Sequence, residues 1–400
     1  MARDQLRVRR DQLSLTQEDL AAMIGVDPMT VRRWETTESM PRPWARRALA
    51  EMLKVDIDEL MRMLQIEPAV TGQDGTGLES CLCGGGESMR RRSLLSAVPA
   101  LATALLPSSV SALEVELSTL WTSYQASRYQ SVVERLPGLL AQLQSHSSHA
   151  GDRRQCERLL GFAYQLSSTV LTKLGHQEPA LNALDEGIRA AERSENPLVL
   201  ASIKRSQAHT LLTFGYASNA LGLAESAIVS SAALSRDDSP DALSVEGTVC
   251  LVAAVAAAKE GDAKLTGRFL DRAEGIAQRL GRDANCLWTA FGPTNVAIHR
   301  VVTSVELGQP RKAIASAPIA SLQSLPSERR ARHAIELARA HSLVGQVDEG
   351  VAVLTEAEAD ASEQIRNHRV SRQLVESWLS SHGHNHKVVS LAQRMHLESA

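Results

Sequence analysis

A recurring spacing of small residues constrains how most of this 400-residue chain can fold. A glycine is followed by a small residue five positions later and by a second small residue seven positions beyond that. Five segments show this spacing: Gly175/Ala180/Gly187, Gly215/Ala220/Ala227, Gly261/Thr266/Ala273, Gly308/Ala313/Ala320 and Gly345/Gly350/Ala357. Such a glycine supplies a turn between helices, and small residues seven apart let the second helix lie close to its neighbours. The pattern predicts an array of helix pairs.

Composition supports the same fold class. Aromatic residues make up 3% of the chain, and runs of strand-favouring residues are nearly absent. We therefore expect an all-α protein. The helix-pair register resembles the tetratricopeptide repeat, although the glycines recur at intervals of 40, 46, 47 and 37 residues, longer than that family's usual period. The resemblance implies an α-solenoid, with weaker capping copies near 121–140 and 363–396. An irregular helical bundle is the alternative.

A different pattern occupies residues 16–35, "TQEDLAAMIGVDPMTVRRWE". Thr16 followed by Asp19 is typical of a helix N-cap, and Leu20 and Ile24 recur at helical spacing. Gly25 then ends this first helix.

The second helix of this stretch begins after Asp27, a capping residue, with Pro28 in its first turn. Val31 and Trp34 form an inward stripe, which leaves a polar and basic face outward. That face comprises Met29, Thr30, Arg32 and Arg33. Arginine can donate a fork to guanine, and methionine can touch a thymine methyl group, so the face suits a DNA major groove. The alternative is a packed helix pair with solvated arginines.

These residues, with "ALAEMLKVDIDEL" further on, resemble the Cro/repressor, or XRE, helix-turn-helix family over about residues 5–64. The resemblance implies a five-helix domain that binds double-stranded operator DNA. It implies a DNA contact for Gln17, phosphate contacts for Arg46 and Arg47, and a buried supporting pair formed by Arg10 and Glu35. The chain departs from the family in lacking its usual glycine after Glu35, which affects the following loop.

The predicted DNA-binding residues are Gln17, Pro28, Met29, Thr30, Arg32, Arg33, Arg46 and Arg47. The net charge of −3 gives no global attraction to DNA, so binding must depend on local patches. Residues 1–10 carry four arginines against one aspartate, and residues 28–50 carry five arginines against two glutamates. Each stretch is therefore +3.

Composition also suggests the domain boundaries. We expect a DNA-binding domain over 1–65, a flexible Gly/Ser-rich linker over 66–92, an apolar connecting segment over 93–112 and a repeat domain over 113–400. The connecting segment follows "MRRR" and superficially resembles a twin-arginine signal or a membrane span. Its position behind a DNA-binding domain, and its Ser, Thr and Pro residues, favour a soluble helix.

Cysteine usage favours the cytoplasm. The chain has five cysteines, an odd number, and its N-terminus shows no apolar signal region. Cys81 and Cys83 lie together in the linker, but two thiolates do not complete a zinc site, and a redox role stays open. The histidines of "SHGHNHK", residues 381–387, favour a solvated turn over a metal site. We expect neither a cofactor nor a metal.

The most distinctive stretch of the array is "CLWTAFGPTNVAIHRVVTSVELG", residues 286–308. A helix beginning near Pro293 places Asn295 and His299 on one face, four residues apart. Trp288 and Phe291 are two of few aromatic residues. Together the four are candidates for a ligand pocket, with the amide of Asn295 bonding a peptide or amide group. The alternative is that the aromatic residues fill a gap at the kink.

The chain shows no phosphate-binding loop, nucleophile elbow or His-Glu-x-x-His motif, so we expect no enzyme. It resembles actinomycete regulators that join an XRE domain to tetratricopeptide repeats. The prediction is a cytoplasmic, homodimeric transcriptional regulator whose repeats sense a peptide, small molecule or protein. The alternative is an interaction scaffold or antitoxin-like repressor whose repeats bind a partner protein without any small effector.

Overall fold

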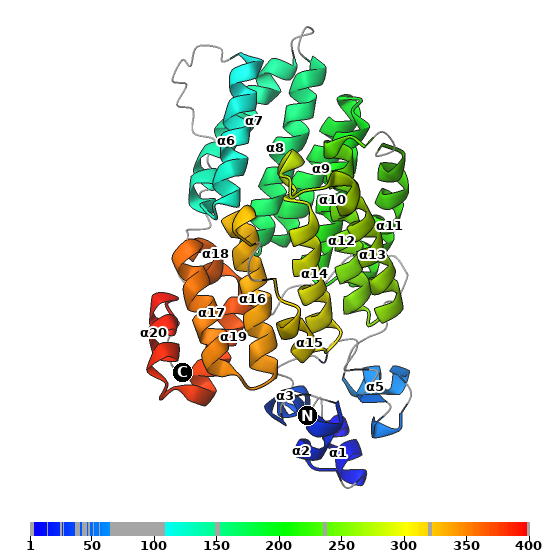
Figure 1. Cartoon of the computed structure of the whole chain (residues 1–400), viewed down its shortest axis with the longest axis vertical. Helices are drawn as coiled ribbons and strands as arrows, with labels where there is room; N and C mark the ends of the chain where they lie inside the picture. Colours follow the sequence, from blue (N-terminus) through cyan, green and yellow to red (C-terminus); the bar gives the residue numbers. More distant parts are fainter. Residues whose placement is uncertain are drawn as a thin grey trace, which may run out of the picture. The chain divides into compact units, whose positions relative to one another are not determined.

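The structure is a computed structural model (Figure 1), and it describes residues 4–13, 15–24, 26, 28–36, 41, 46, 49–50, 52–55, 57–64, 109–148, 153–234, 238–318 and 322–397. Regular structure in these ranges is helical apart from a single bridge between Ala284 and Phe291. The all-α prediction is therefore confirmed. The described residues form two compact units, one with α1 to α5 and one with α6 to α20. The predicted linker and most of the predicted connecting segment lie outside the described residues.

The N-terminal unit consists of short helices around one apolar centre. Four have defined bounds: α1 (Asp4–Gln12), α2 (Gln17–Ile24), α3 (Pro28–Glu35) and α5 (Ile57–Met63). The fifth expected helix falls in a stretch where residues 46, 49–50 and 52–53 are helical. The apolar side chains of the centre are Leu6, Leu20, Val31, Trp34, Leu49, Leu53, Leu60 and Leu64, all buried.

The C-terminal unit is built from consecutive helix pairs. The pairs are α6 (Val110–Gln125) with α7 (Tyr129–Ser147), α8 (Arg153–Lys173) with α9 (Gln177–Arg193), α10 (Pro197–Thr213) with α11 (Ala217–Leu234), α12 (Pro240–Lys259) with α13 (Ala263–Leu280), α14 (Pro293–Glu306) with α15 (Pro310–Ala315), and α16 (Ser327–Leu343) with α17 (Val347–Asp360). The chain ends with α18 (Ser362–Asn367), α19 (Arg369–His382) and α20 (His386–Arg394). Two short 3-10 turns, η1 (Cys286–Trp288) and η2 (Leu322–Ser324), flank the α14–α15 pair.

The helix α6 begins at Val110, inside the segment that the sequence assigns to the connection. Val110 is itself buried in the core of the first helix pair, with Leu113 and Leu117. The packed part of the repeat unit therefore reaches slightly further toward the N-terminus than residue 113.

Turn glycines join five of these pairs, as the spacing predicts. Gly175, Gly215, Gly261, Gly308 and Gly345 have φ values of 82°, 97°, 77°, 74° and 78°. This left-handed conformation is one that side chains disfavour, which explains the glycine. The small residues further along are buried, except that Ala357 is half-buried and Ala320 lies outside the described residues. A Cβ on Gly350 would lie 2.9 Å from the Trp378 ring, so this helix approaches its neighbour closely.

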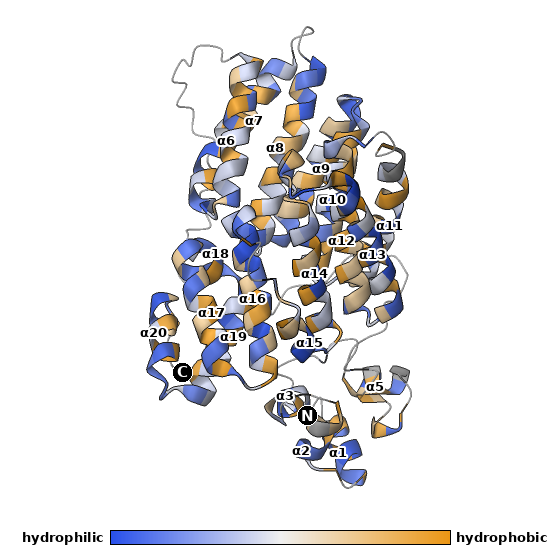
Figure 2. Ribbon diagram, viewed as in Figure 1, coloured by the Kyte–Doolittle hydropathy of each residue, from blue (hydrophilic) through white to orange (hydrophobic). Residues whose placement is uncertain are grey.

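The helix α12 is the centre of the largest core. It is the one described helix long and apolar enough to cross a membrane, yet 94% of its apolar window is buried inside the protein. The buried residues of α12 are mostly alanine and valine. By contrast, α20 carries both hydrophilic and hydrophobic residues (Figure 2). A helix that is apolar all round and covered by neighbours is a core helix.

The late helices of the array also contact its first helices. The Tyr129 hydroxyl, at the start of α7, donates to Gln364 of α18 at 2.6 Å. Lys173 of α8 forms a buried ion pair with Glu328 of α16. The helices α6 and α16 are also in contact. An open solenoid has contacts between neighbouring repeats only. Here the first helix pair is additionally joined to the late helices.

Candidate functional site

A capping box fixes the start of α2. The Thr16 amide donates to the Asp19 carboxylate at 2.9 Å, and the Asp19 amide donates to the Thr16 hydroxyl at 3.0 Å. The bonds from the Thr16 backbone and side chain lower the pKa of Asp19. Two otherwise unpaired amides at the helix start are thereby satisfied. The next capping candidates, Gly25 and Asp27, lie outside the described residues.

A buried ion pair connects α1 to the end of α3. Arg10 and Glu35 are 6% and 8% exposed. Arg10 Nε donates to Glu35 Oε1 at 2.7 Å, and its Nη2 donates to Oε2 at 3.3 Å. The bond to Glu35 raises the pKa of Arg10 against the opposing effect of burial. The Gln17 amide also donates to Glu35, at 2.6 Å. The pair thus links α1, α2 and α3.

The two faces of α3 differ as the sequence predicts. Val31 and Trp34 point into the apolar centre. Met29 is 47% exposed, Arg32 is exposed, and Thr30 and Arg33 are half-buried. Within the described part of this unit the Arg32 guanidinium makes no hydrogen bond or ion pair, so it is available to a ligand. Exposed Pro28 starts the helix.

Of the remaining residues predicted to contact DNA, two are half-buried and hydrogen-bonded within the domain, and one lies outside the described residues. Gln17 is half-buried, with its amide nitrogen held by Glu35. Arg46 is half-buried and its Nε donates to the Pro41 carbonyl at 2.7 Å. Arg47 lies outside the described residues. Gln17 therefore takes part in the support of α3 as well as lying at the start of α2.

Sequence reasoning missed a role for Arg9. Its Nε donates to the Leu53 carbonyl at 2.9 Å, and its Nη2 donates to the Lys54 carbonyl at 3.1 Å. These carbonyls end a helical stretch and lack partners within it. Arg9 therefore ties α1 to the second half of the unit. Charge counting had placed it only in a basic patch, and no local motif marks a partner 44 residues away.

Comparison with known proteins supports a specific assignment for this unit. Residues 6–60 match the helix-turn-helix family model. No curated protein matches the chain. The matched range contains α2 and α3 and both members of the Arg10–Glu35 pair. The N-terminal unit is thus an XRE-type helix-turn-helix domain, a class of domain found in DNA-binding regulators.

In the second unit, the structure separates the four candidate pocket residues into two groups. Phe291 is completely buried, with its ring against Gly247 of α12, where an added Cβ would lie 2.0 Å from a ring carbon. Trp288 stacks on Trp121, with ring centroids 5.0 Å apart and planes 7° apart. It also meets the Phe162 ring edge-on at 5.5 Å. These two aromatic residues pack between helices.

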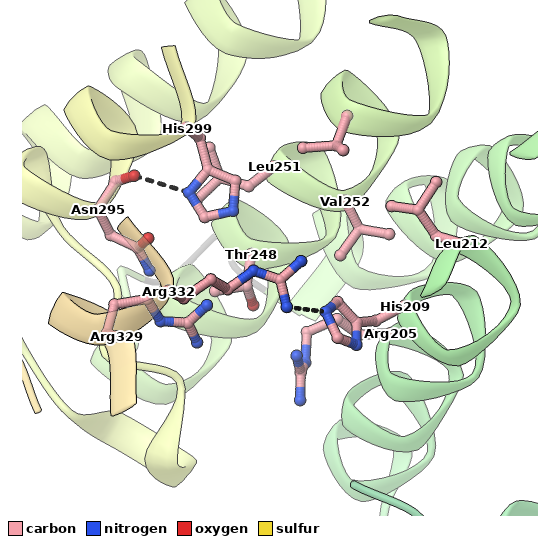
Figure 3. A pocket seen from close by; sticks show the side chains of 11 residues that line it. Arg205, His209, Leu212, Thr248, Leu251, Val252, Asn295, His299, Arg329 and Arg332 are labelled. Atoms are coloured by element: carbon pink, nitrogen blue, oxygen red, sulfur yellow. Dashed lines mark hydrogen bonds between the residues drawn. The ribbon is translucent and has the colours of Figure 1, made fainter. Parts of the chain in front are cut away.

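Asn295 and His299 instead line a cavity in the repeat unit (Figure 3). Asn295 is completely buried, and its Nδ2 donates to the Ala290 carbonyl at 2.8 Å. His299 Nδ1 lies 2.8 Å from the Asn295 carbonyl oxygen, which requires the proton on Nδ1. The space in which the centre of a water molecule can move is about 30 Å³.

Basic side chains that the sequence did not single out complete the cavity. Arg205 and His209 come from α10, and Arg329 and Arg332 come from α16. Burial and the neighbouring Arg329 lower the pKa of Arg205 to about 10. Burial, aided by Arg329, lowers the pKa of His299 to about 3. Arg205 lies more than 120 positions before Arg329 and Arg332, so no local pattern brings it together with them.

Among the described residues, no group of three or more His, Cys, Asp or Glu side chains is arranged to hold a metal. Cys81 and Cys83 lie outside those residues. Burial raises the pKa of the Cys250 thiol to about 12, so this thiol is not a nucleophile at neutral pH.

Proposed function

We propose that the protein is a sequence-specific, DNA-binding transcriptional regulator. The observation that carries the proposal is the outward face of α3, in a domain that matches the helix-turn-helix family. The proposed domain scheme keeps DNA-binding residues 1–65 and linker 66–92, followed by a connecting segment from residue 93 and a repeat domain that begins with α6 at Val110 instead of at residue 113. We place the protein in the cytoplasm and propose that it acts by binding, without catalysis or a cofactor.

The reading residues of this proposal are Met29, Thr30, Arg32 and Arg33, with Pro28 at the helix start. Arg32 is the principal base contact, because its guanidinium is exposed and can donate two parallel bonds to guanine. Gln17 and Arg46 with Arg47 contact the DNA backbone. The Arg10–Glu35 pair holds the reading helix at a fixed angle to α1.

A homodimer is the proposed DNA-binding species. One small domain makes few base contacts, and two domains on half-sites about 34–36 Å apart give affinity and a palindromic operator. The repeat domain supplies the dimer contact in this proposal.

The repeat domain is proposed to be a tetratricopeptide-like sensor. Five helix pairs with left-handed glycine turns and buried small residues support the resemblance. The cavity lined by Asn295 and His299 supports ligand sensing, with Trp288 and Phe291 shaping the adjacent loop. The plan resembles the peptide-sensing regulators of Gram-positive bacteria, which pair the same two modules.

The test is binding of fragmented genomic DNA to the purified full-length protein, followed by sequencing of the bound fragments. An Arg32→Ala/Arg33→Ala variant is run beside it, with Arg7→Ala as a control that removes an exposed charge from α1. We expect a recovered palindrome that the double variant loses and the control retains. The same enrichment by the double variant would disprove the assignment of the reading helix.

A further inference from the structure

Three arginine side chains meet at one cavity inside the repeat unit. Arg205 extends from α10, and Arg329 and Arg332 extend from α16 toward it (Figure 3). The other lining residues are His209, Leu212, Thr248, Leu251, Val252, Val255, Asn295 and His299. None of these residues is acidic. The cavity thus carries three formal positive charges and no negative charge in its wall.

Arginines elsewhere in this unit, the buried Arg339 and the partly exposed Arg366 and Arg394, have carboxylate partners. Arg339 lies 3.0 Å from Glu306 and 3.0 Å from Glu336, and all three side chains are buried. Arg366 and Arg394 share the buried Glu358 at 2.9 and 2.6 Å. These three arginines each have a carboxylate partner, whereas no carboxylate lines the cavity.

The carboxylate of Glu328, close to the cavity, already has cationic partners. Glu328 is held by the buried Lys173, while Arg329 lies 3.8 Å from its other oxygen. Burial alone would raise the pKa of Glu328, but Lys173 and Arg329 lower it to about 2, so it stays charged. A single negative charge thus faces four cations, which are Lys173 and the three arginines.

Several polar atoms of the cavity residues are buried and unbonded. They are Arg205 Nε, Arg329 Nε and Asn295 Oδ1. Arg332 Nη1 donates to His209 Nε2 at 3.0 Å, which requires a neutral imidazole as acceptor. A buried charge or donor without a partner costs free energy that a ligand can recover.

We propose that this cavity binds a compact oxyanion, a phosphoryl or carboxylate group that the three arginines hold together. The inference rests on the sensor role proposed above and gives that role a ligand class. Guanidinium groups match phosphate and carboxylate with two parallel donors, and their positive charges would be neutralised by the ligand. The small space admits a small anion or the anionic end of a larger ligand.

The site joins parts of the array that are distant in sequence. An anion held by Arg205 and Arg332 connects α10 to α16 directly. Asn295, at the cavity wall, also holds the Ala290 carbonyl of the loop before α14. In that loop Leu287, Trp288 and Ala290 have φ of 47°, 56° and 50°, a strained conformation for residues with side chains. Occupancy of the cavity thus acts on the loop through Asn295.

The experiment is a calorimetric titration of the full-length protein at fixed ionic strength with inorganic phosphate, glycerol phosphate and succinate, against sodium chloride. We expect saturable binding of at least one of the three oxyanions. Phosphate and glycerol phosphate without succinate would identify a phosphoryl ligand, and succinate alone would identify a carboxylate ligand. Either pattern supports the site, and heats equal to those of chloride for all three would overturn it.

Substitutions locate the binding. Arg205→Gln and Arg332→Gln are expected to weaken binding at least tenfold. The matched control is Arg330→Gln, on the same helix α16, because Arg330 pairs with Asp360 and does not line the cavity. Unchanged binding in Arg205→Gln and Arg332→Gln would overturn the site.

Thermal unfolding without added oxyanion separates ligand binding from a structural role. Arg205→Gln removes a cation from a group of like charges, so the melting temperature should stay equal or rise. A fall of several degrees would show that Arg205 is a structural residue and would count against the site.

Failure of this inference can be told apart from failure of the proposed function. Recovery of a palindrome together with no oxyanion binding would remove the site and leave the DNA-binding proposal intact. Oxyanion binding lost in Arg205→Gln but with no enriched DNA would support the site and count against the regulator.

Discussion

At the scale of single residues, Glu35 holds helices of the DNA-binding domain together. It is buried, and it accepts bonds from Arg10 and Gln17, so three helices depend on one carboxylate. Breaking a buried ion pair leaves an uncompensated charge, which costs about 3–5 kcal/mol. The position of α3, and with it the reading face, follows from this contact.

We therefore expect Glu35→Ala to destabilise the N-terminal unit by about 3–5 kcal/mol, because Arg10 loses its buried partner and keeps only the exposed carboxylate of Asp11. Chemical denaturation of the full-length protein, followed by Trp34 and far-ultraviolet signals, measures the loss. Glu18→Ala is the control, because Glu18 is exposed on α2. A loss below about 1 kcal/mol would mean that the pair contributes little.

Arg32 is expected to determine base preference. Arg32→Ala should reduce the affinity ratio between operator and scrambled DNA by about 1–3 kcal/mol, roughly 5- to 150-fold, the value of one bidentate contact. Fluorescence anisotropy with both DNA fragments measures the ratio. Arg7→Ala should lower both affinities alike and keep the ratio. A ratio that survives in Arg32→Ala would place the base contacts on other residues.

At the scale of elements, α12 and the loop before α14 are in close contact, and of the glycines in the described residues Gly247 has the least room for a Cβ. Gly247 faces the ring of Phe291, and there is no room for a side chain between them. The loop is therefore pressed directly onto the central helix. The aromatic residues of this loop serve as anchors between α6, α8 and α12.

Gly247→Ala should destabilise the repeat unit by about 1–3 kcal/mol, because the new methyl group overpacks a filled core. Thermal unfolding measures the change. Gly267→Ala in α13 is the control, because nothing lies within 4 Å of its added Cβ. Alanine there should be neutral or stabilise by up to about 1 kcal/mol through helix propensity. Equal behaviour of the two variants would contradict the packing argument.

Elements with a local signal were predictable from sequence. The capping box at Thr16 and the turn glycines at Gly175 and Gly345 depend on residues only a few positions apart. The loop before α14 was recognised as unusual, but its left-handed residues carry no composition signal, since Leu287 and Trp288 rarely adopt that conformation.

The cavity could be predicted only in part. Asn295 and His299 share one helix face, so their spacing revealed them. Arg205 and Arg332 lie on helices brought together by the whole array, and a sequence shows neither that they meet at one cavity nor that no carboxylate lines it. Trp288 and Phe291 were grouped with Asn295 by proximity along the chain, whereas their rings pack against other helices.

At the scale of the whole molecule, buried histidines make stability depend on pH. Burial lowers the pKa of His299 to about 3, with Arg329, Arg332 and His333 adding to the shift, and burial lowers the pKa of His333 to about 4. Unfolded histidine titrates near 6.5. The unfolded state therefore binds protons first as pH falls, and stability present above about pH 6.5 is lost toward pH 4.

We expect the free energy of unfolding of the repeat unit to fall between pH 7.5 and pH 5.5. The loss should be about 1 kcal/mol for each buried histidine at pH 5.5, one unit below the unfolded pKa. Urea denaturation at both pH values measures it. A His333→Gln variant should lose less than the wild-type protein. Equal stability at the two pH values would show that these histidines are accessible to protons in the folded state.

The contact between Tyr129 and Gln364 has a consequence for how this protein can change over evolution. A linear array gains or loses a helix pair at little cost, because each pair meets only its neighbours. In this molecule, an inserted pair would carry α18 away from α7 and separate Lys173 from Glu328. This protein therefore cannot vary by duplication or deletion of repeats, which is the usual source of variation in such arrays. The hydrogen bond between α7 and α18 therefore fixes the number of helix pairs in the repeat unit.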